Sequence, residues 1–372
     1  MNKTNMATDF EYTFPAVRGI QAGSEYYITM CPLRYIERLF KFDDEDILSP
    51  ELRAQRILNR GRIPQLARYI VDNPTNYVFS AITASVDGAV KFTNTDNNEP
   101  HKTKIGTLTI NMASHLIIND GQHRREAIMQ ALSINPKLKD ETIAVVLFID
   151  KGLERSQQMF SDLNRHAIRP SRSLGLLYDH RNDMAKIAKL LAIESDAFKG
   201  LVEMERSSLS ERSRKLFTLS AIYTGCQSLL DLMDTKDTDE AYSICLDYWN
   251  EVGMQLDDWQ QVKALRITSG EIRRDYIHSH AIALQCLGQV GSYLLNEHKK
   301  DWKSKVQILK DINWSRSNAE VWEGRALIGG RVSKTTTNVI LTTNYIKQFM
   351  KLDLTPDEQQ IEDMYMRGGN GR

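Results

Sequence analysis

Hydrophobic and polar positions in the first 170 residues alternate in short runs, a pattern that predicts a mixed sheet with short helices. Residues 10–30 contain two β-rich runs separated by Gly23-Ser24, which predicts a hairpin. Asp87-Gly88 predicts a second hairpin turn between strands at 77–86 and 89–92. The almost wholly apolar run 142–149 is typical of an interior strand. Further strands are expected at 105–110 and 115–118, and helices at 32–40, 50–60, 64–73 and 152–163.

From Leu174 onward the apolar residues follow helical spacing, with helices expected at 179–193, 209–233, 241–256, 277–297 and 339–350. The chain therefore predicts an α+β or α/β protein. A mixed-sheet domain is expected over residues 1–170, and a mainly helical domain over residues 171–354. A loop rich in glycine, tryptophan and arginine spans 311–338, and the polar residues 355–372 are predicted to form a flexible tail.

Composition excludes several classes of protein. The 372 residues carry a formal net charge of zero, which argues against coating nucleic acid by bulk electrostatics but leaves room for a local basic face. The cysteines are widely separated, so no zinc site or disulfide framework is indicated, and we expect buried thiols in a reducing cytoplasm. Residues 1–14 are polar and no long apolar run occurs, so neither a signal peptide nor a membrane helix is expected.

The stretch Leu116–Ile128 is the most informative part of the chain. An apolar run ends in Asn-Asp-Gly and passes directly into helical spacing, which predicts a strand, a tight turn and a helix start. Gly121 permits a positive φ, and Asp120 is predicted to cap the helix. Gln122, His123, Arg124 and Arg125 would then occupy the first turn, where backbone N–H groups and two guanidinium groups favour a phosphate. The alternative is an ordinary strand–glycine–helix junction with solvated arginines.

Two other stretches are basic. Arg53, Arg56 and Arg60 share one face of the helix expected at 50–60, and Arg62 and Arg68 follow closely. In the 311–338 loop, Trp314 and Trp322 interleave with glycines and with Arg316, Arg325, Arg331 and Lys334. Aromatic, glycine and basic residues mixed in this way suit contact with nucleic acid. The alternatives are a solvated helix face in the first case and tryptophans packed on the helical domain in the second.

These residues carry a family resemblance. The sequence DGQHR at 120–124 matches the name-giving motif of the DGQHR-domain proteins, and Phe160-Ser161-Asp162-Leu163-Asn164, followed by Pro170-Ser171, is a second matching patch. Within that group the chain resembles the DndB family of the bacterial DNA phosphorothioation system, including the segments 274–280 and 322–331. The pattern Gly121-x-His123-Arg124 is similar to the GxxR phosphate loop of the ParB and sulfiredoxin fold. Sulfiredoxin has its reactive cysteine where this chain has Gln122, so sulfiredoxin-type sulfur chemistry is not expected here.

The resemblance implies a ParB/sulfiredoxin-like mixed-sheet domain followed by the helical domain. It also implies a cytoplasmic DNA-binding repressor of the modification genes, which are related to restriction–modification systems. The expected partners are promoter DNA of its own operon and other phosphorothioation proteins, and homo-oligomerisation stays open. An alternative is a nucleotide-binding or nucleotide-hydrolysing enzyme that uses a nucleotide with a divalent metal, and a third is a scaffold for the modification enzymes. Phosphate or nucleotide would be held by Asp120, Gly121, Gln122, His123, Arg124, Arg125 and Asn164.

No catalytic residue can be assigned from the sequence. HExxH and GxSxG motifs are absent, and GxxxxGK[ST] does not occur in the glycine-rich loop. No metal-ligand set is visible. The residues predicted to contact DNA are Arg53, Arg56, Arg60, Arg62, Arg316, Arg325, Arg331 and Lys334.

Overall fold

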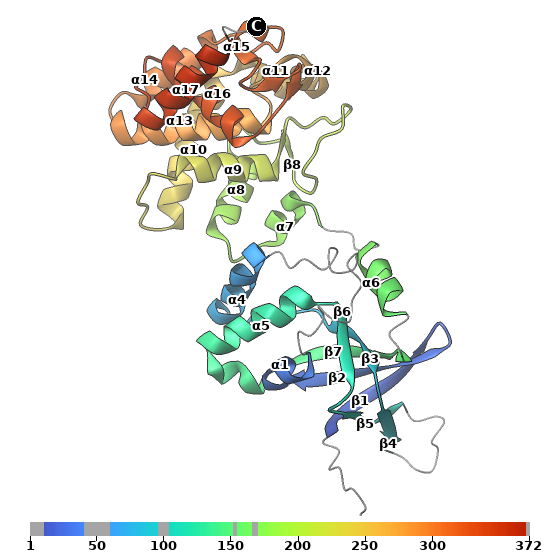
Figure 1. Ribbon diagram of the computed structural model, residues 1–372. Helices are drawn as coiled ribbons and strands as arrows, with labels where there is room; N and C mark the ends of the chain where they lie inside the picture. Colours follow the sequence, from blue (N-terminus) through green and yellow to red (C-terminus); the bar gives the residue numbers. More distant parts are fainter. Residues whose placement is uncertain (1–10, 41–59, 96–103, 152–154, 166–169, 370–372) are drawn as a thin grey trace, which may run out of the picture. The chain divides into compact units, whose positions relative to one another are not determined.

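The computed structural model describes residues 11–40, 60–95, 104–151, 155–165 and 170–369. The chain divides into two compact units, Met1–Ile168 and Arg169–Arg372. The first combines a mixed seven-stranded sheet with short helices, and the second is mainly helical (Figure 1). The predicted α+β class with a helical carboxyl-terminal part is therefore confirmed.

The first unit contains, in chain order, β1 (Glu11–Gln21), β2 (Ser24–Pro32), η1 (Leu33–Tyr35), α1 (Ile36–Leu39), η2 (Arg60–Arg62), α4 (Ile63–Asp72), β3 (Ile82–Asp87), β4 (Val90–Asn94), β5 (Ile105–Asn111), β6 (His115–Asp120), α5 (Gln122–Ile134), η3 (Pro136–Asp140), β7 (Thr142–Ile149) and α6 (Ser156–Arg165). The strand order is β4-β5-β1-β2-β7-β3-β6, and within the described part of this sheet only β3 and β7 pair in parallel. β7 lies between β2 and β3, as the interior-strand prediction required.

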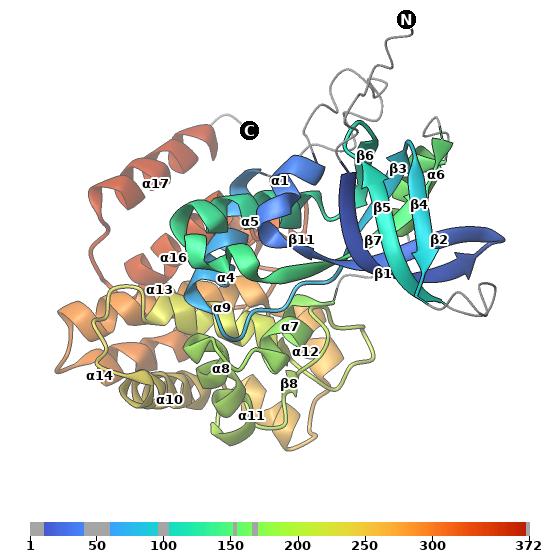
Figure 2. The same ribbon diagram turned by 90° about the horizontal axis from the view of Figure 1, so that it is seen from below.

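The sheet must curl on itself, because β3 and β4 are joined by only two residues. They stand sixth and first in the strand order. Five strand spacings of a flat sheet span roughly 24 Å, whereas three Cα–Cα steps reach at most about 11 Å. The predicted hairpin at Asp87-Gly88 is wrong: β3 pairs with β6 and β4 with β5, so residues 82–94 and 105–120 form one long bent hairpin. Figure 2 shows β1, β5 and β4 turning across β7 and β3.

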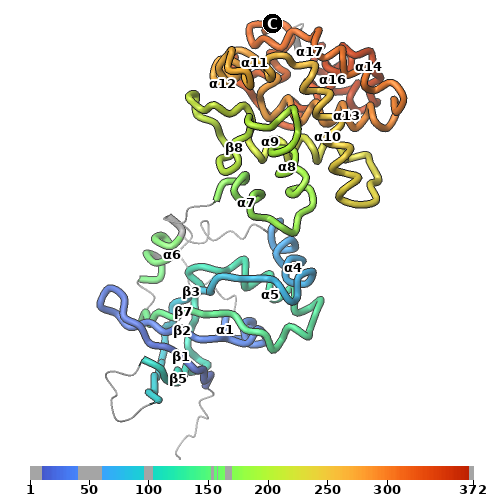
Figure 3. The backbone as a smooth tube through the Cα atoms, turned by 180° about the vertical axis from the view of Figure 1, so that it is seen from behind, coloured from blue at the N-terminus to red at the C-terminus, as the bar shows by residue number. Residues whose placement is uncertain are grey.

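Two helices that precede and follow the bent hairpin pack together against this sheet. α4 and α5 lie side by side in Figures 1 and 3 and are in contact. Ile70 of α4 and Ala127, Ile128 and Ala131 of α5 are buried in the core of the unit. The apolar spacing recognised in the sequence thus fixes which faces of these helices meet the strands.

The second unit contains α7 (Arg172–Tyr178), α8 (Asp183–Glu194), β8 (Val202–Glu203), β9 (Phe217–Thr218), α9 (Leu219–Leu229), α10 (Thr238–Gln255), α11 (Asp257–Lys263), α12 (Ser269–Asp275), α13 (Ala281–Glu297), α14 (Trp302–Val306), η5 (Gln307–Asp311), α15 (Ala319–Trp322), β10 (Leu327–Ile328), β11 (Arg331–Val332), α16 (Thr336–Phe349) and α17 (Pro356–Gly369). α9 and α13 form its central pair. Their backbones approach so closely that a Cβ at Gly288 would lie 2.3 Å from the carbonyl oxygen of Gly225. Glycine is required there for the packing.

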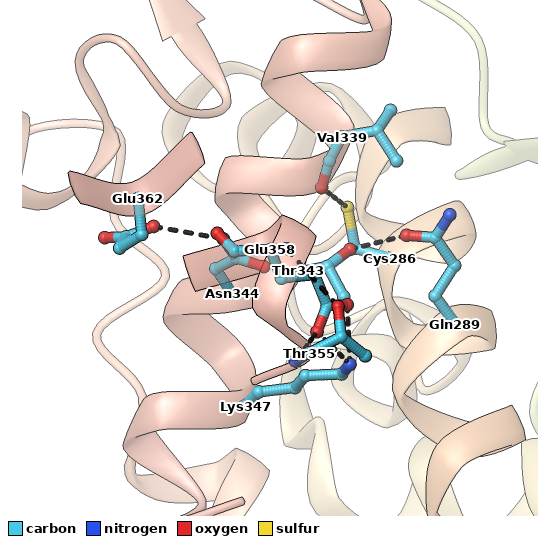
Figure 4. Close-up of polar contacts among 9 residues, drawn as sticks. All are labelled: Cys286, Gln289, Val339, Thr343, Asn344, Lys347, Thr355, Glu358 and Glu362. Carbon is cyan, nitrogen blue, oxygen red and sulfur yellow. Dashed lines mark hydrogen bonds and ion pairs between the residues drawn. The ribbon is translucent and has the colours of Figure 1, made fainter. Parts of the chain in front are cut away.

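Two predictions for this unit are corrected. The expected helix at 209–233 begins only at Leu219, where the Thr218 hydroxyl accepts from the N–H of Ala221 and caps it. The predicted flexible tail is wrong for residues 356–369, which form α17. Buried Glu362 pairs with buried Arg325. Figure 4 shows the contact between Lys347 and Glu358. These charged contacts hold α17 against the rest of the unit.

All cysteines of the chain are buried and free, as expected from their spacing. Burial raises the pKa of the Cys31 and Cys286 thiols to about 12. Cys286 lies among the polar contacts of α13 and α16, where its Sγ donates to the carbonyl oxygen of Val339 (Figure 4). Of the helices that the structure describes, none combines the length and apolar character needed to cross a bilayer.

Candidate phosphate-binding site

The predicted turn is present. β6 ends at Asp120, Gly121 has φ 112°, and α5 begins at Gln122. A Cβ at Gly121 would lie 3.1 Å from Cγ1 and 3.3 Å from Cα of Ile82. Both the positive φ and this close approach favour glycine. The turn is therefore built from a strand end and a helix start, as the sequence indicated.

Asp120 does not cap the helix as predicted, because Gly121 occupies the cap position. Instead Asp120 Oδ2 accepts from Arg124 Nη2 at 2.8 Å, and the same nitrogen donates to the carbonyl oxygen of Ala81 at 2.9 Å. Arg124 thus joins the end of β6 to the residue before β3. Its side chain is about one-fifth exposed, so the guanidinium is held in place while part of it stays accessible.

Arg125 has a different role from Arg124. It is buried, its Nη2 donates to the carbonyl oxygen of Phe40 at 3.0 Å, and its Nη1 pairs with Glu126 at 2.8 Å. Successive helical residues point about 100° apart, so the two side chains leave α5 in different directions. The prediction that both guanidinium groups meet at the turn is wrong, because Arg125 binds within the fold.

Arg62, at the start of α4, is the second arginine at this site, where Arg125 was expected. Arg62, His123 and Arg124 line one cavity of about 420 Å³. Arg62 is exposed and occupies the cap position of α4, so α4 and α5 both begin at this cavity. Neither helix has an acidic residue in its first turn, and the residues that line the cavity include no carboxylate. The partial positive charge of two helix starts adds to the side chains, so the cavity suits an anion.

The protonation of His123 responds to these neighbours. Burial lowers the pKa of its imidazole, and the positive charges of Arg62 and Arg124 lower it further. Without an anion, His123 is therefore mainly neutral at pH 7. A bound phosphate would oppose the two guanidinium charges and favour the protonated imidazole.

Buried polar residues fix the strand that leads into the turn. Asn119 is fully buried; its Nδ2 donates to Ser85 Oγ at 2.8 Å and its Oδ1 accepts from Ser156 Oγ at 2.7 Å. The pairing of β3 with β6 shifts register at Thr83/Ala84, opposite Asn119. β3, β6 and the start of α6 are thereby tied together beside Asp120. Asn164 lies in α6, and its side chain falls outside the described structure.

The structure places the residues predicted to contact DNA in different local surroundings. Arg53 and Arg56 lie outside the described residues, as does the side chain of Arg60 in η2. Arg331 and Lys334 are exposed. Arg316 donates to the carbonyl oxygens of Arg274 at 3.0 Å and Gly330 at 2.7 Å.

Arg325 is buried against Glu362 and the carbonyl oxygen of Leu341, so it is not placed to contact DNA. The tryptophans of the 311–338 loop are also interior. Trp314 and Trp322 are buried and stack at 5.4 Å between ring centroids. They form part of the core of the second unit, which is the alternative that the sequence left open.

Sequence reasoning missed the aromatic wall of the cavity. Tyr69 and Phe79 line it, with ring centroids 6.1 Å apart, and the Tyr69 hydroxyl accepts from the N–H of Val78 at 2.9 Å. Nothing local in the sequence distinguishes these rings from core residues. Among the described residues, no group of three or more His, Cys, Asp or Glu side chains could hold a metal ion.

Comparison with known proteins gives one match. A family model described as DndB, DNA-sulfur modification-associated, matches residues 14–353. No curated protein and no solved structure matches the chain. The likeness to the ParB and sulfiredoxin fold therefore stays a prediction.

Substitution of Gly121 tests the geometry of the turn. We expect Gly121→Ala to lower the free energy of unfolding by about 1–3 kcal/mol, because alanine is strained at this φ and its Cβ meets Ile82. The matched control is Gly175→Ala in α7, where a Cβ meets nothing within 4 Å; it should change stability by less than about 1 kcal/mol. Urea unfolding of the full chain measures both. Equal effects of the two substitutions would contradict the described turn.

Proposed function

The chain belongs to the DndB family of DNA-sulfur modification-associated proteins, and from this membership we propose that it binds DNA as a transcriptional regulator of the modification genes. The observation that carries the proposal is the cavity of Arg62, His123 and Arg124, in which a phosphate would meet two guanidinium groups and no lining carboxylate. With a net charge of zero, the chain needs such local sites to hold a polyanion.

Arg124, Arg62 and His123 would each contribute differently to phosphate binding. Arg124 is fixed by Asp120 and Ala81, so little side-chain freedom is lost when its exposed part meets a phosphate oxygen. Asp120 pairs with Arg124 and offsets part of its charge. Arg62 is exposed and adds a second positive charge at the cavity. His123 donates a further hydrogen bond once protonated. Contacts with phosphates position a protein on the DNA backbone, whereas the base sequence is recognised through contacts with base edges and through DNA shape.

Further DNA contacts are proposed in the second unit at Arg331 and Lys334, which are exposed. The pKa of Lys334 is lowered by desolvation from neighbouring protein atoms and by the nearby charge of Arg172. Two cations that lie this close repel one another, and a DNA phosphate would relieve the repulsion. Promoter DNA of its own operon is the proposed target, and other phosphorothioation proteins are proposed partners.

A second candidate function is nucleotide binding, with or without hydrolysis. The cavity volume of about 420 Å³ lies in the range of small-molecule sites, and Tyr69 and Phe79 offer rings beside the basic groups. Asp120 is about half exposed and could share a divalent ion with the phosphates. A nucleotide that occupied the cavity would compete with a DNA phosphate for Arg62 and Arg124.

Arg62→Ala tests the DNA proposal. We expect affinity for the operon's upstream duplex to fall roughly tenfold, because one charge-assisted contact is lost. The slope of log K against log salt should shrink by about 0.9, as for one phosphate contact. The matched control is Arg68→Ala, an exposed arginine of α4 that does not line the cavity. Fluorescence anisotropy over a salt series measures both quantities.

Three outcomes of that titration are decisive. Equal affinity of the unaltered chain for upstream and random duplexes would refute the regulator proposal. Equal losses for Arg62→Ala and Arg68→Ala would show that the cavity is not the phosphate site. If Arg62→Ala loses nucleotide binding but keeps its affinity for DNA, the result would favour the nucleotide-binding function.

The pH dependence of DNA binding tests His123. Its pKa is lowered in the free protein and should rise when an anion binds, so binding takes up a proton. Affinity should therefore increase as the pH falls from 8 to 6, a range in which phosphodiesters do not titrate. His123→Gln should remove most of this dependence. An unchanged pH profile in His123→Gln would exclude the imidazole from the site.

A further inference from the structure

The helical unit contains a second basic cavity, separate from the DGQHR turn. It has a volume of about 380 Å³. Four basic residues line it, Arg273, Arg274, Arg316 and His280, with Glu211 as the one acidic residue of the lining. The segment Arg274–His280 contributes Arg274, Ser279 and His280 to the lining of this cavity.

Two of these arginines are held by neutral groups and form no ion pair within the described part of the chain. Arg273 Nη2 donates to the carbonyl oxygens of Ser210, Glu211 and Ser213 at 2.9–3.1 Å. Arg316 donates to carbonyl oxygens only, those of Arg274 and Gly330. Among the ion pairs of the described residues, Arg274 is matched by Asp275, whereas neither Arg273 nor Arg316 has a carboxylate. Neutral carbonyl groups orient the two guanidinium groups but do not cancel their charge.

The pKa of His280 is lowered by its surroundings in this cavity. Burial lowers its pKa to about 4, with additional contributions from the charges of Arg316 and Arg273. Its Nε2 lies 2.8 Å from the carbonyl oxygen of Arg273, which fits a neutral imidazole that donates from Nε2. His280 precedes α13 without capping it, and Ala281, the first residue of this 17-residue helix, also lines the cavity. The helix start adds to the positive charge of the side chains.

We propose that this cavity binds the phosphate group of a small phosphorylated molecule, held by Arg273 and Arg316. The hydroxyl group of Ser208 at the wall provides a hydrogen bond for a phosphate oxygen. The cavity is concave and its volume lies near the lower end of the range for small-molecule sites, which favours a small ligand over a duplex. The site is independent of the DNA function proposed above.

Ser208 offers a test that leaves the arginines intact. It is exposed and lines the cavity. Ser208→Glu places a negative charge beside the guanidinium groups, and Ser208→Gln is the neutral control of the same shape. With the full chain carrying Arg62→Ala, so that the first cavity is weakened, pyrophosphate binding is measured by titration calorimetry. We expect a loss of roughly tenfold to a hundredfold in affinity for Ser208→Glu and little change for Ser208→Gln.

Arg316→Ala should weaken pyrophosphate binding to a similar degree. Arg266→Ala should not, because Arg266 is exposed and lies outside the cavity lining. Thermal unfolding of each variant shows whether the unit is still folded. The proposal fails if pyrophosphate does not bind, if Ser208→Glu and Ser208→Gln bind it equally, or if only duplex DNA binding responds to these substitutions.

Discussion

The hydrogen bonds of a single guanidinium organise the candidate site. Arg124 Nη2 bridges the carboxylate of Asp120, where β6 ends, and the carbonyl oxygen of Ala81, before β3 begins. β3 and β6 pair with one another, so this contact links the ends of both strands to the start of α5. Each hydrogen bond to a charged group contributes about 1.5–3 kcal/mol. A side chain held in this way has already lost its rotamer freedom, which lowers the entropic cost of binding an anion.

The surroundings of each arginine separate structural from functional charges, although the sequence presents them alike. Arg325 is buried against Glu362, and Arg125 is buried against Phe40 and Glu126, so both stabilise the fold. Arg124 is only partly neutralised by Asp120, and Arg62 is exposed at the same cavity. The formal net charge of zero therefore conceals local regions of uncompensated positive charge. In this molecule those regions lie at the starts of helices, where backbone N–H groups reinforce them.

Local patterns predicted the parts of the fold that depend on neighbours in sequence. The strand–glycine–helix turn at Gly121 and the interior strand β7 were predicted correctly from apolar runs and a single glycine. The hairpin at Asp87-Gly88 was wrong because β3 pairs with β6, about thirty residues away, and the sheet curls. Phe40, whose carbonyl oxygen accepts from Arg125, and Glu362, which pairs with Arg325, are likewise remote in sequence, so periodicity gives no sign that these two arginines are buried. Arg62 was noticed as a basic residue, but its meeting with His123 depends on α4 packing against α5.

A structure of the full chain bound to an upstream duplex would test the central claim most directly. The account predicts a backbone phosphate within hydrogen-bonding distance of Arg62, His123 and Arg124, at the shared start of α4 and α5. It also predicts that Arg124 keeps its contacts with Asp120 and Ala81 when the DNA is bound. A complex in which this cavity holds no phosphate, and in which the DNA contacts other surfaces alone, would contradict the account.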